Sequence, residues 1–167
     1  SPNTENLRNF HDEEKFKELI NSIEEEKIKL KSKTPIVVKI SPDILDNQIN
    51  TISEILLKYK VSAIIVSNTT ESSRENLQNI LKNQKGGLSG KPLEEKSNRL
   101  IAKFYNLLKG KIEIIGVGGV DSGKSAYEKF LSGASYIQLY TGMVFQGPNI
   151  VRKIKKELKE LLISDGV

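Results

Sequence analysis

The chain has 167 residues, of which 37% are hydrophobic and 28% charged, and its 26 lysines and arginines outnumber 21 acidic residues to give a net charge of +5. This length and balance are typical of one globular domain, and the mixing of lysines with glutamates argues against a nucleic-acid-binding surface. The absence of cysteine and the single histidine exclude disulfides, thiolate or multi-histidine metal sites and a cysteine nucleophile, so we predict no bound metal.

Helices and short apolar strands alternate along the chain. Apolar residues at helical spacing predict helices, and short β-branched runs between turn residues predict buried strands. The predicted helices cover residues 12–31, 44–59, 94–108, 125–131 and 149–163, and the predicted strands cover residues 36–40, 63–66, 112–117 and 136–139. Residues 71–93 fit neither pattern and predict a long functional loop, with a short helix near residues 75–81.

This alternation predicts an α/β fold with a parallel sheet. Four strand–helix units would form the C-terminal half of a (β/α)8 TIM barrel, and an open doubly wound sheet is the main alternative. The chain begins with Ser1-Pro2-Asn3-Thr4 and has no initial methionine, which we interpret as the back part of a longer protein.

Polar residues stand at the ends of the first two predicted strands, where parallel sheets bind ligands. Lys39 is a lone charge in an apolar strand, and it either faces an anionic ligand or reaches solvent or a structural carboxylate. Ser67, Asn68 and Thr69 follow the second strand. Their donors and acceptors suit a planar polar ligand, although the same residue types also form local turns.

Glycines follow the third and fourth predicted strands. Gly118 and Gly119 come after the third strand, and Thr141 and Gly142 come after the fourth. Either pair alone is compatible with an ordinary turn. Because neighbouring strand ends meet in a barrel, the two pairs together predict a phosphate site built from backbone N–H groups.

Six motifs, in order and at plausible spacing, resemble the dihydroorotate dehydrogenase family over nearly the whole chain. They are SPNTENLR at 1–8, VKISPD at 38–43, SNTT at 67–70, GGLSGKPL at 86–93, IIGVGGVDSG at 114–123 and GASYIQLYTG at 133–142. The resemblance implies that residues 1–167 are the C-terminal part of a single FMN-binding TIM barrel domain.

The resemblance also implies an activity. The family oxidises dihydroorotate to orotate in pyrimidine biosynthesis: a base removes the C5 proton and hydride passes from C6 to FMN. Quinone-dependent class 2 members use a serine before Pro-Asn-Thr as the base, whereas class 1 members use a cysteine. Ser1 stands at that position and the chain has no cysteine, which points to class 2. A serine needs a relay or a desolvated site to act as a base.

The same resemblance implies roles for the other site residues. The substrate would contact Asn3, Asn68 and Thr69, and Lys39 would contact the flavin. The remaining FMN contacts would be Ser67, Gly90, Gly118, Gly119, Tyr140 and Thr141. The loop at residues 71–93 would lie over the flavin, with Ser89 and Gly90 against it.

The chain departs from the family pattern in two respects. It lacks the family's first half, including the segment that contacts membrane and quinone. Through that segment the family is associated with the cytoplasmic side of the bacterial inner membrane or with the mitochondrial inner membrane. Glu5-Asn6 also replaces the family's Pro-Gly. The alternatives are another FMN-barrel oxidoreductase, either class 1-like or dihydropyrimidine-oxidising, and a non-catalytic half-barrel that binds phosphate.

Overall fold

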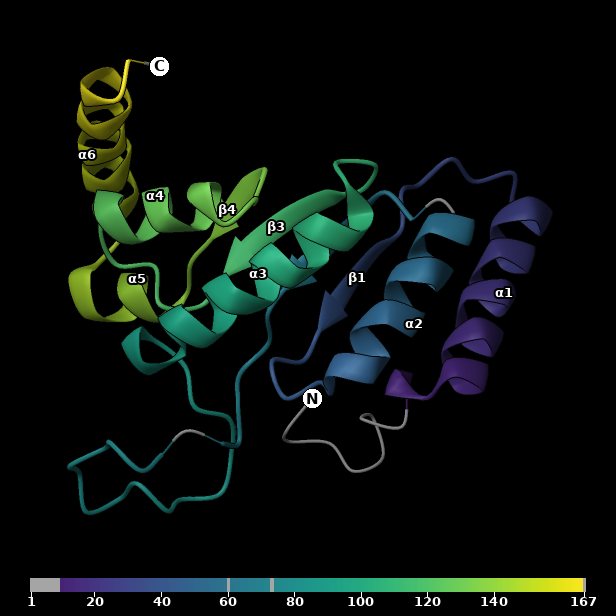
Figure 1. The fold of residues 1–167 in the computed structure, drawn as a ribbon, viewed down its shortest axis with the longest axis horizontal. Helices are drawn as coiled ribbons and strands as arrows, with labels where there is room; N and C mark the ends of the chain where they lie inside the picture. Colours follow the sequence, from purple (N-terminus) through teal and green to yellow (C-terminus); the bar gives the residue numbers. More distant parts are fainter. Residues whose placement is uncertain (1–9, 60, 73, 167) are drawn as a thin grey trace.

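The computed structural model of the chain describes residues 10–59, 61–72 and 74–166. Its centre is a parallel sheet in which the strands follow one another in chain order (Figure 1). The strands are β1 (Val37–Ile40), β2 (Ala63–Val66), β3 (Glu113–Val117) and β4 (Tyr136–Gln138). Because all four are parallel, their carboxyl ends lie along one edge of the sheet.

Helices follow the strands and form one layer. The long helices are α1 (Glu13–Lys29), α2 (Asp46–Lys58), α3 (Glu94–Leu108), α4 (Gly123–Leu131) and α6 (Ile150–Ser164). Each packs against the next, α1 on α2, α2 on α3, α3 on α4 and α4 on α6. Strands in chain order beside a single helix layer make half of a barrel. A doubly wound sheet would instead reverse its strand order and place helices on both faces.

Local sequence explains where two of these helices begin. The Asp12 side chain accepts a hydrogen bond of 3.2 Å from the Lys15 amide and so caps α1. Before α4, Ser122 and Ser125 cap reciprocally, each hydroxyl accepting from the other residue's amide. The capping of α4 directs the chain away from the end of β3, where the predicted glycines lie.

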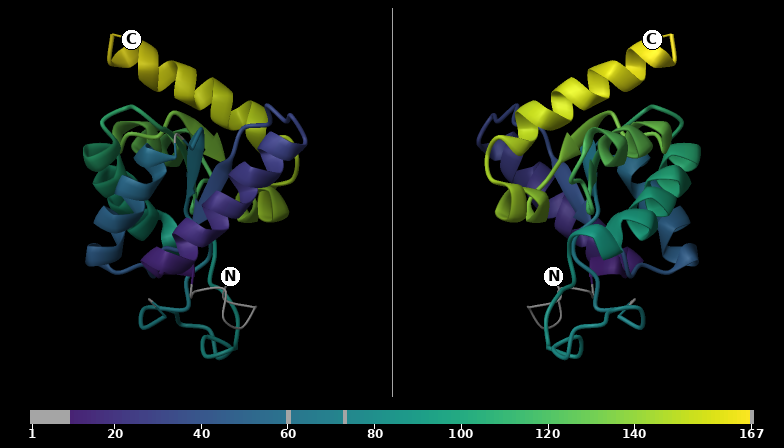
Figure 2. Two further views of the ribbon diagram at one scale, coloured as in Figure 1. Left: turned by 90° about the vertical axis from the view of Figure 1, so that its right-hand side faces the viewer. Right: turned by 90° about the vertical axis from the view of Figure 1, so that its left-hand side faces the viewer.

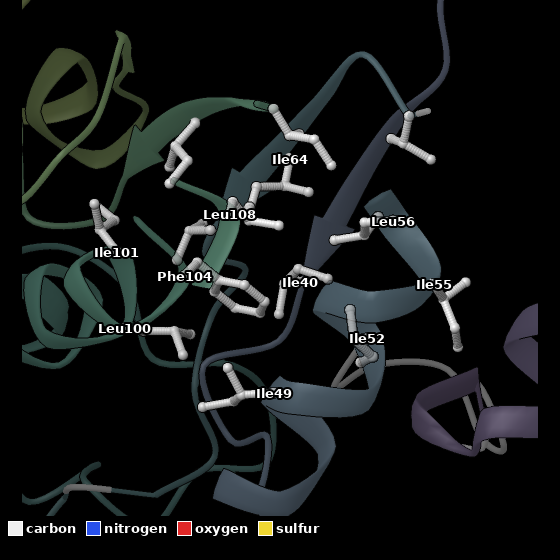
Figure 3. Packing of buried hydrophobic residues seen from close by; sticks show 14 of the residues in the cluster. Ile40, Ile49, Ile52, Ile55, Leu56, Ile64, Leu100, Ile101, Phe104 and Leu108 are labelled. Atoms are coloured by element: carbon white, nitrogen blue, oxygen red, sulfur yellow. The ribbon is translucent and has the colours of Figure 1, made fainter. Parts of the chain in front are cut away.

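The main core lies between the sheet and the helices α2 and α3 (Figure 3). The labelled side chains of this cluster are Ile40, Ile49, Ile52, Ile55, Leu56, Ile64, Leu100, Ile101, Phe104 and Leu108. At the end of α3, Leu108 is buried, whereas its neighbour Leu107 is 37% exposed. Leu108 falls four residues after the buried Phe104, which keeps it on the same face of the helix.

The opposite face of the sheet carries a different row of residues. Lys39, Ile65, Ile115 and Tyr136 pair across the four strands, and none of them is fully buried. The next row contains Ile40 and Val66, which are buried against the helices. Side chains alternate between the two faces of a strand. Lys39 therefore points away from the helices α2 and α3.

The predicted helix near residues 75–81 is wrong. Residues 74–87 form turns, and an antiparallel bridge between Thr70 and Leu88 closes the loop at its base. The Arg74 guanidinium donates to the carbonyls of Lys82 and Gln84, both at 2.9 Å, and to that of Gly86. These bonds hold the loop in shape without a helix. Figure 2 shows the loop at one end of the molecule and α6 at the opposite end.

Two short elements were not predicted from the sequence. They are the 3₁₀ turn η2 (Lys91–Leu93), which leads into α3, and the helix α5 (Thr141–Gln146), which follows β4. Within the described residues, no helix combines the length and apolar character needed to cross a membrane.

Candidate functional site

A cavity of about 590 Å³ lies at the carboxyl edge of the sheet. Residues from the ends of all four strands line it, together with the end of the long loop and the first part of α5. The lining residues are Lys39, Ser67, Asn68, Thr69, Ser89, Gly90, Lys91, Pro92, Leu93, Val117, Gly118, Gly119, Val120, Asp121, Leu139, Tyr140, Thr141, Gly142, Phe145 and Gln146.

Every predicted site residue that the structure describes lines this cavity. These residues are Lys39, Ser67, Asn68, Thr69, Gly90, Gly118, Gly119, Tyr140 and Thr141. Ser1 and Asn3 lie outside the described residues. The structure thus brings together side chains and backbone segments that are up to about a hundred residues apart in the sequence, while their individual roles stay predictions.

Gly118 and Gly119 form a turn that other residues could not replace without strain. Their φ angles are +114° and +78°, in the region that favours glycine. A Cβ on Gly119 would lie 2.4 Å from the Cβ and 2.7 Å from the Cα of Glu94, at the start of α3. Among the described residues, the N–H groups of both glycines donate to no other protein group. The turn can therefore present two amide donors to an anion.

The end of the long loop lies against the end of β4. The Thr141 hydroxyl donates to the Ser89 hydroxyl at 2.9 Å, and a Cβ on Gly90 would lie 3.0 Å from Thr141 Cγ2. Ser89 and Gly90 therefore line one side of the cavity, while their contact with a flavin stays a prediction. The other described residues of the loop, 71–72 and 74–88, are absent from the cavity lining.

Lys39 reaches the cavity from the face of the sheet opposite α2 and α3. No carboxylate of the described residues lies within ion-pair distance of its ammonium group, so the structural-carboxylate alternative finds no support in this part of the chain. The side chain is exposed, which removes the cost of burying its charge. Lys39 can offer a positive charge to a ligand in the cavity.

Asn68 and Thr69 combine turn chemistry with exposure to the cavity. The Asn68 side-chain oxygen accepts from the Thr69 amide at 2.9 Å, and the Asn68 amide donates to the Ile40 carbonyl at 2.8 Å. Asn68 and Thr69 also line the cavity. The segment therefore forms a local turn and also lies at the cavity, while its contact with a ligand stays a prediction.

An ion pair between Asp43 and Lys96 holds the segment that follows Thr69. One Asp43 carboxylate oxygen accepts from Lys96 and Thr70, both at 2.5 Å, and the other accepts from the Glu71 amide at 2.9 Å. Burial would raise the pKa of Asp43, but the hydrogen bonds from Lys96, Thr70 and Glu71 outweigh it and lower the pKa from 3.8 to about 2. This network ties the ends of β1 and β2 to α3.

The Asp43→Asn variant is expected to lower the free energy of unfolding by about 1–2 kcal/mol at neutral pH. The pKa of Asp43 is lower in the folded state, so its stabilisation is complete above pH 3.8 and disappears as the pH falls through about 2. Urea unfolding from pH 7 down to pH 2 should show the difference between wild type and variant shrinking with acid.

The matched control for this experiment is Asp46→Asn. Asp46 pairs with Lys103 at 2.6 Å, but the two side chains are 80% and 50% exposed. Exposed pairs contribute little, so this variant should unfold like the wild type. Equal losses of unfolding free energy in the two variants would contradict the proposal that the Asp43 network stabilises the fold more than an exposed ion pair does.

Sequence reasoning missed two charged residues that line the cavity, Lys91 and Asp121. Lys91 Nζ lies 2.5 Å from Glu94 and 3.8 Å from Asp121, and the hydrogen bond to Glu94 raises the pKa of Lys91. Lys91 directly follows the predicted Gly90, and Asp121 lies two residues after the predicted Gly119. In the described residues no three histidine, aspartate or glutamate side chains gather as metal ligands would.

Comparisons with known proteins agree over nearly the whole chain. Residues 1–162 match the family model described as Dihydroorotate dehydrogenase. Three relatives carry the name dihydroorotate dehydrogenase (quinone): one from Christiangramia forsetii, 41% identical over 96% of this chain; one from Wigglesworthia glossinidia brevipalpis, 47% identical over 93%; and a mitochondrial one from Mus musculus, 40% identical over 99%.

A crystal structure of DHODH from Eimeria tenella in complex with ferulenol is also similar. Its TM-score is 0.94 and its sequence identity 32%, and the match covers 99% of this chain and 49% of that one. The three relatives are covered over 47%, 48% and 42% of their length. The chain thus spans about half the length of the proteins it matches.

Proposed function

Because the chain belongs to the dihydroorotate dehydrogenase family, we propose that the protein containing it oxidises dihydroorotate to orotate with FMN as its cofactor. The observation that carries this proposal is the cavity. Nine residues that the family motifs assign to substrate or flavin, spread from Lys39 to Thr141, line one space of about 590 Å³. A protein that bound only phosphate would not need Lys39, Asn68 and Thr69 in the same cavity.

The residues at the cavity suit FMN. Gly118 and Gly119, with their unpaired N–H groups, would hold the phosphate together with Tyr140 and Thr141. Ser67, Gly90 and Lys39 would contact the rest of the cofactor. When bound, FMN would supply the hydride acceptor of the oxidation.

The protein's own residues would position the substrate and move its proton. Asn68 and Thr69 would hydrogen-bond dihydroorotate from one side and Asn3 from the other, which fixes its orientation. Ser1 would accept the C5 proton. The exposed ammonium of Lys39 would stabilise negative charge that develops next to it during the reaction.

The electron acceptor is proposed from the relatives. Several are named dihydroorotate dehydrogenase (quinone), and the serine of the SPNT motif belongs to the same class, so we propose a quinone acceptor. Membrane association follows from the quinone, which is dissolved in the bilayer, and would be made by parts of the protein outside residues 10–166.

The absorption spectrum tests this function. The protein at its natural length should purify yellow, and anaerobic dihydroorotate should bleach the flavin band, while dihydrouracil should leave it unchanged. A yellow protein bleached by dihydrouracil alone would favour a dihydropyrimidine-oxidising relative. A colourless protein that binds no added FMN would overturn the proposal.

Lys39→Ala is expected to lower flavin retention or to slow flavin reduction by about 10-fold or more, because the cavity loses an exposed cation that forms no ion pair among the described residues. Flavin content after purification and anaerobic stopped-flow reduction measure the two effects. Lys33→Ala, which removes an exposed lysine just before β1, is the matched control. Unchanged flavin content and rate in Lys39→Ala would remove this residue from the site.

A further inference from the structure

Lys129 of α4 is a fully buried lysine next to the candidate site. Its ammonium group donates to the Ser97 hydroxyl at 3.1 Å and to the Asn98 side-chain oxygen at 2.8 Å, both on α3. In the described residues no carboxylate lies within 4 Å of it. A buried cation without a paired anion is costly, so its presence calls for a compensating interaction.

Ser97 connects this cation to the glycine turn. The Ser97 hydroxyl donates to the Val117 carbonyl at 2.7 Å, directly before Gly118. A Cβ on Gly118 would lie 3.4 Å from the Ser97 Cβ. On β3, the Lys129 side chain packs beside Gly116, where a Cβ would lie 3.1 Å from Lys129 Cδ. The ammonium group therefore sits behind the turn, one hydrogen-bonded side chain away from it.

Carboxylates on the helices next to α4, which carries Lys129, are paired with other groups. Burial lowers the pKa of Lys129 from 10.5 to about 8, and Glu94 of α3 partly opposes this effect. Glu94 is itself paired with Lys91 at 2.5 Å. On the α6 side, Glu157 accepts from the Gly123 amide and Asp165 from Tyr127, and neither contacts Lys129. β4 carries no charged residue.

We propose that Lys129 is a positioning residue for the phosphate group of the flavin cofactor, acting from behind the Gly118–Gly119 turn through Ser97 and through its positive charge. This inference rests on the proposed function. The ammonium group does not touch the ligand. Through Ser97, the ammonium group holds the carbonyl side of the turn, so that the glycine N–H groups face the cavity. Its positive charge also favours an anion bound at these N–H groups, because the protein interior screens charge poorly.

The proposal predicts a linkage between phosphate binding and the protonation of Lys129. A bound phosphate favours the charged lysine, so phosphate binding should weaken as the pH rises through the pKa of Lys129. Riboflavin has the same ring system as FMN but no phosphate. The ratio of the FMN affinity to the riboflavin affinity therefore reports the contribution of the phosphate to binding. Any ionisation of the ring affects both ligands equally and does not change the ratio.

The experiment measures this ratio by flavin fluorescence in the apoprotein at its natural length, between about pH 6.5 and 9.5. In the wild type the ratio should fall about 10-fold over this range. In Lys129→Met it should be low already at pH 6.5 and independent of pH, while riboflavin binding is unchanged. Lys124→Met, at an exposed position of the same helix, is the matched control and should follow the wild type.

Each outcome decides the question. A wild-type ratio that is independent of pH would overturn the proposal even if Lys129→Met did not fold. Equal losses of FMN and riboflavin affinity in Lys129→Met would indicate a merely structural role and would also overturn it, and in both cases the flavoenzyme proposal would survive. A wild-type protein that bound neither flavin would overturn the proposed function and this inference together.

Discussion

Ser1→Ala is expected to slow the reduction of bound flavin by dihydroorotate about 100- to 10,000-fold, the range that a general base contributes. Alanine has no group that could accept the C5 proton. FMN should stay bound, because the residues proposed to hold it lie between Lys39 and Thr141 at the cavity. Anaerobic stopped-flow measurement of flavin bleaching gives the rate, and the flavin absorbance of the purified variant gives the content.

Two further variants sharpen this test. Ser22→Ala removes an exposed serine on α1 and should reduce its flavin at the wild-type rate. Ser1→Cys keeps a proton acceptor with a lower intrinsic pKa, near about 8.5, and should retain part of the rate with a pH profile shifted to lower pH. A normal rate in Ser1→Ala would show that another group is the base.

Local patterns predicted the strands and long helices well because short-range chemistry determines them. The predicted strand at residues 63–66 and the predicted helix at residues 94–108 have the bounds of β2 and α3. Parallel strands then bring their ends to one edge, so residues after different strands were expected to share a site. The cavity, lined by every described predicted residue, follows from that geometry.

The features that sequence reasoning missed depend on contacts between distant residues. Residues 75–81 have some helical spacing, but Arg74 binds carbonyls eight to twelve residues ahead and holds turns instead. Lysines are almost always exposed, so Lys129 gave no sign of burial. Its partners Ser97 and Asn98 are about thirty residues away and belong to another helix. No local pattern links them.

Gly119→Ala is expected to destabilise the protein by about 2–5 kcal/mol and to abolish FMN retention. Two effects add. The φ angle of +78° is unfavourable for alanine, and the new Cβ would lie 2.4 Å from the Glu94 Cβ and 2.7 Å from its Cα. Since two of the three nearest atoms belong to the backbone at the start of α3, a side-chain rotation cannot relieve the overlap. Either α3 or the glycine turn must move, and both moves disturb the amide donors proposed for the phosphate.

Gly110→Ala separates the two effects. Gly110 has a φ of +72°, close to that of Gly119, but no atom lies within 4 Å of the position its Cβ would take, and it lies at the opposite end of β3 from the cavity. This control should lose only about 1–2 kcal/mol, the cost of the backbone conformation, and should keep its flavin. Urea unfolding and flavin content of both variants give the comparison. If the two variants lost equal stability and both kept FMN, the contact between Gly119 and Glu94 would not be what holds the turn against α3, and the phosphate site would have to tolerate a displaced turn.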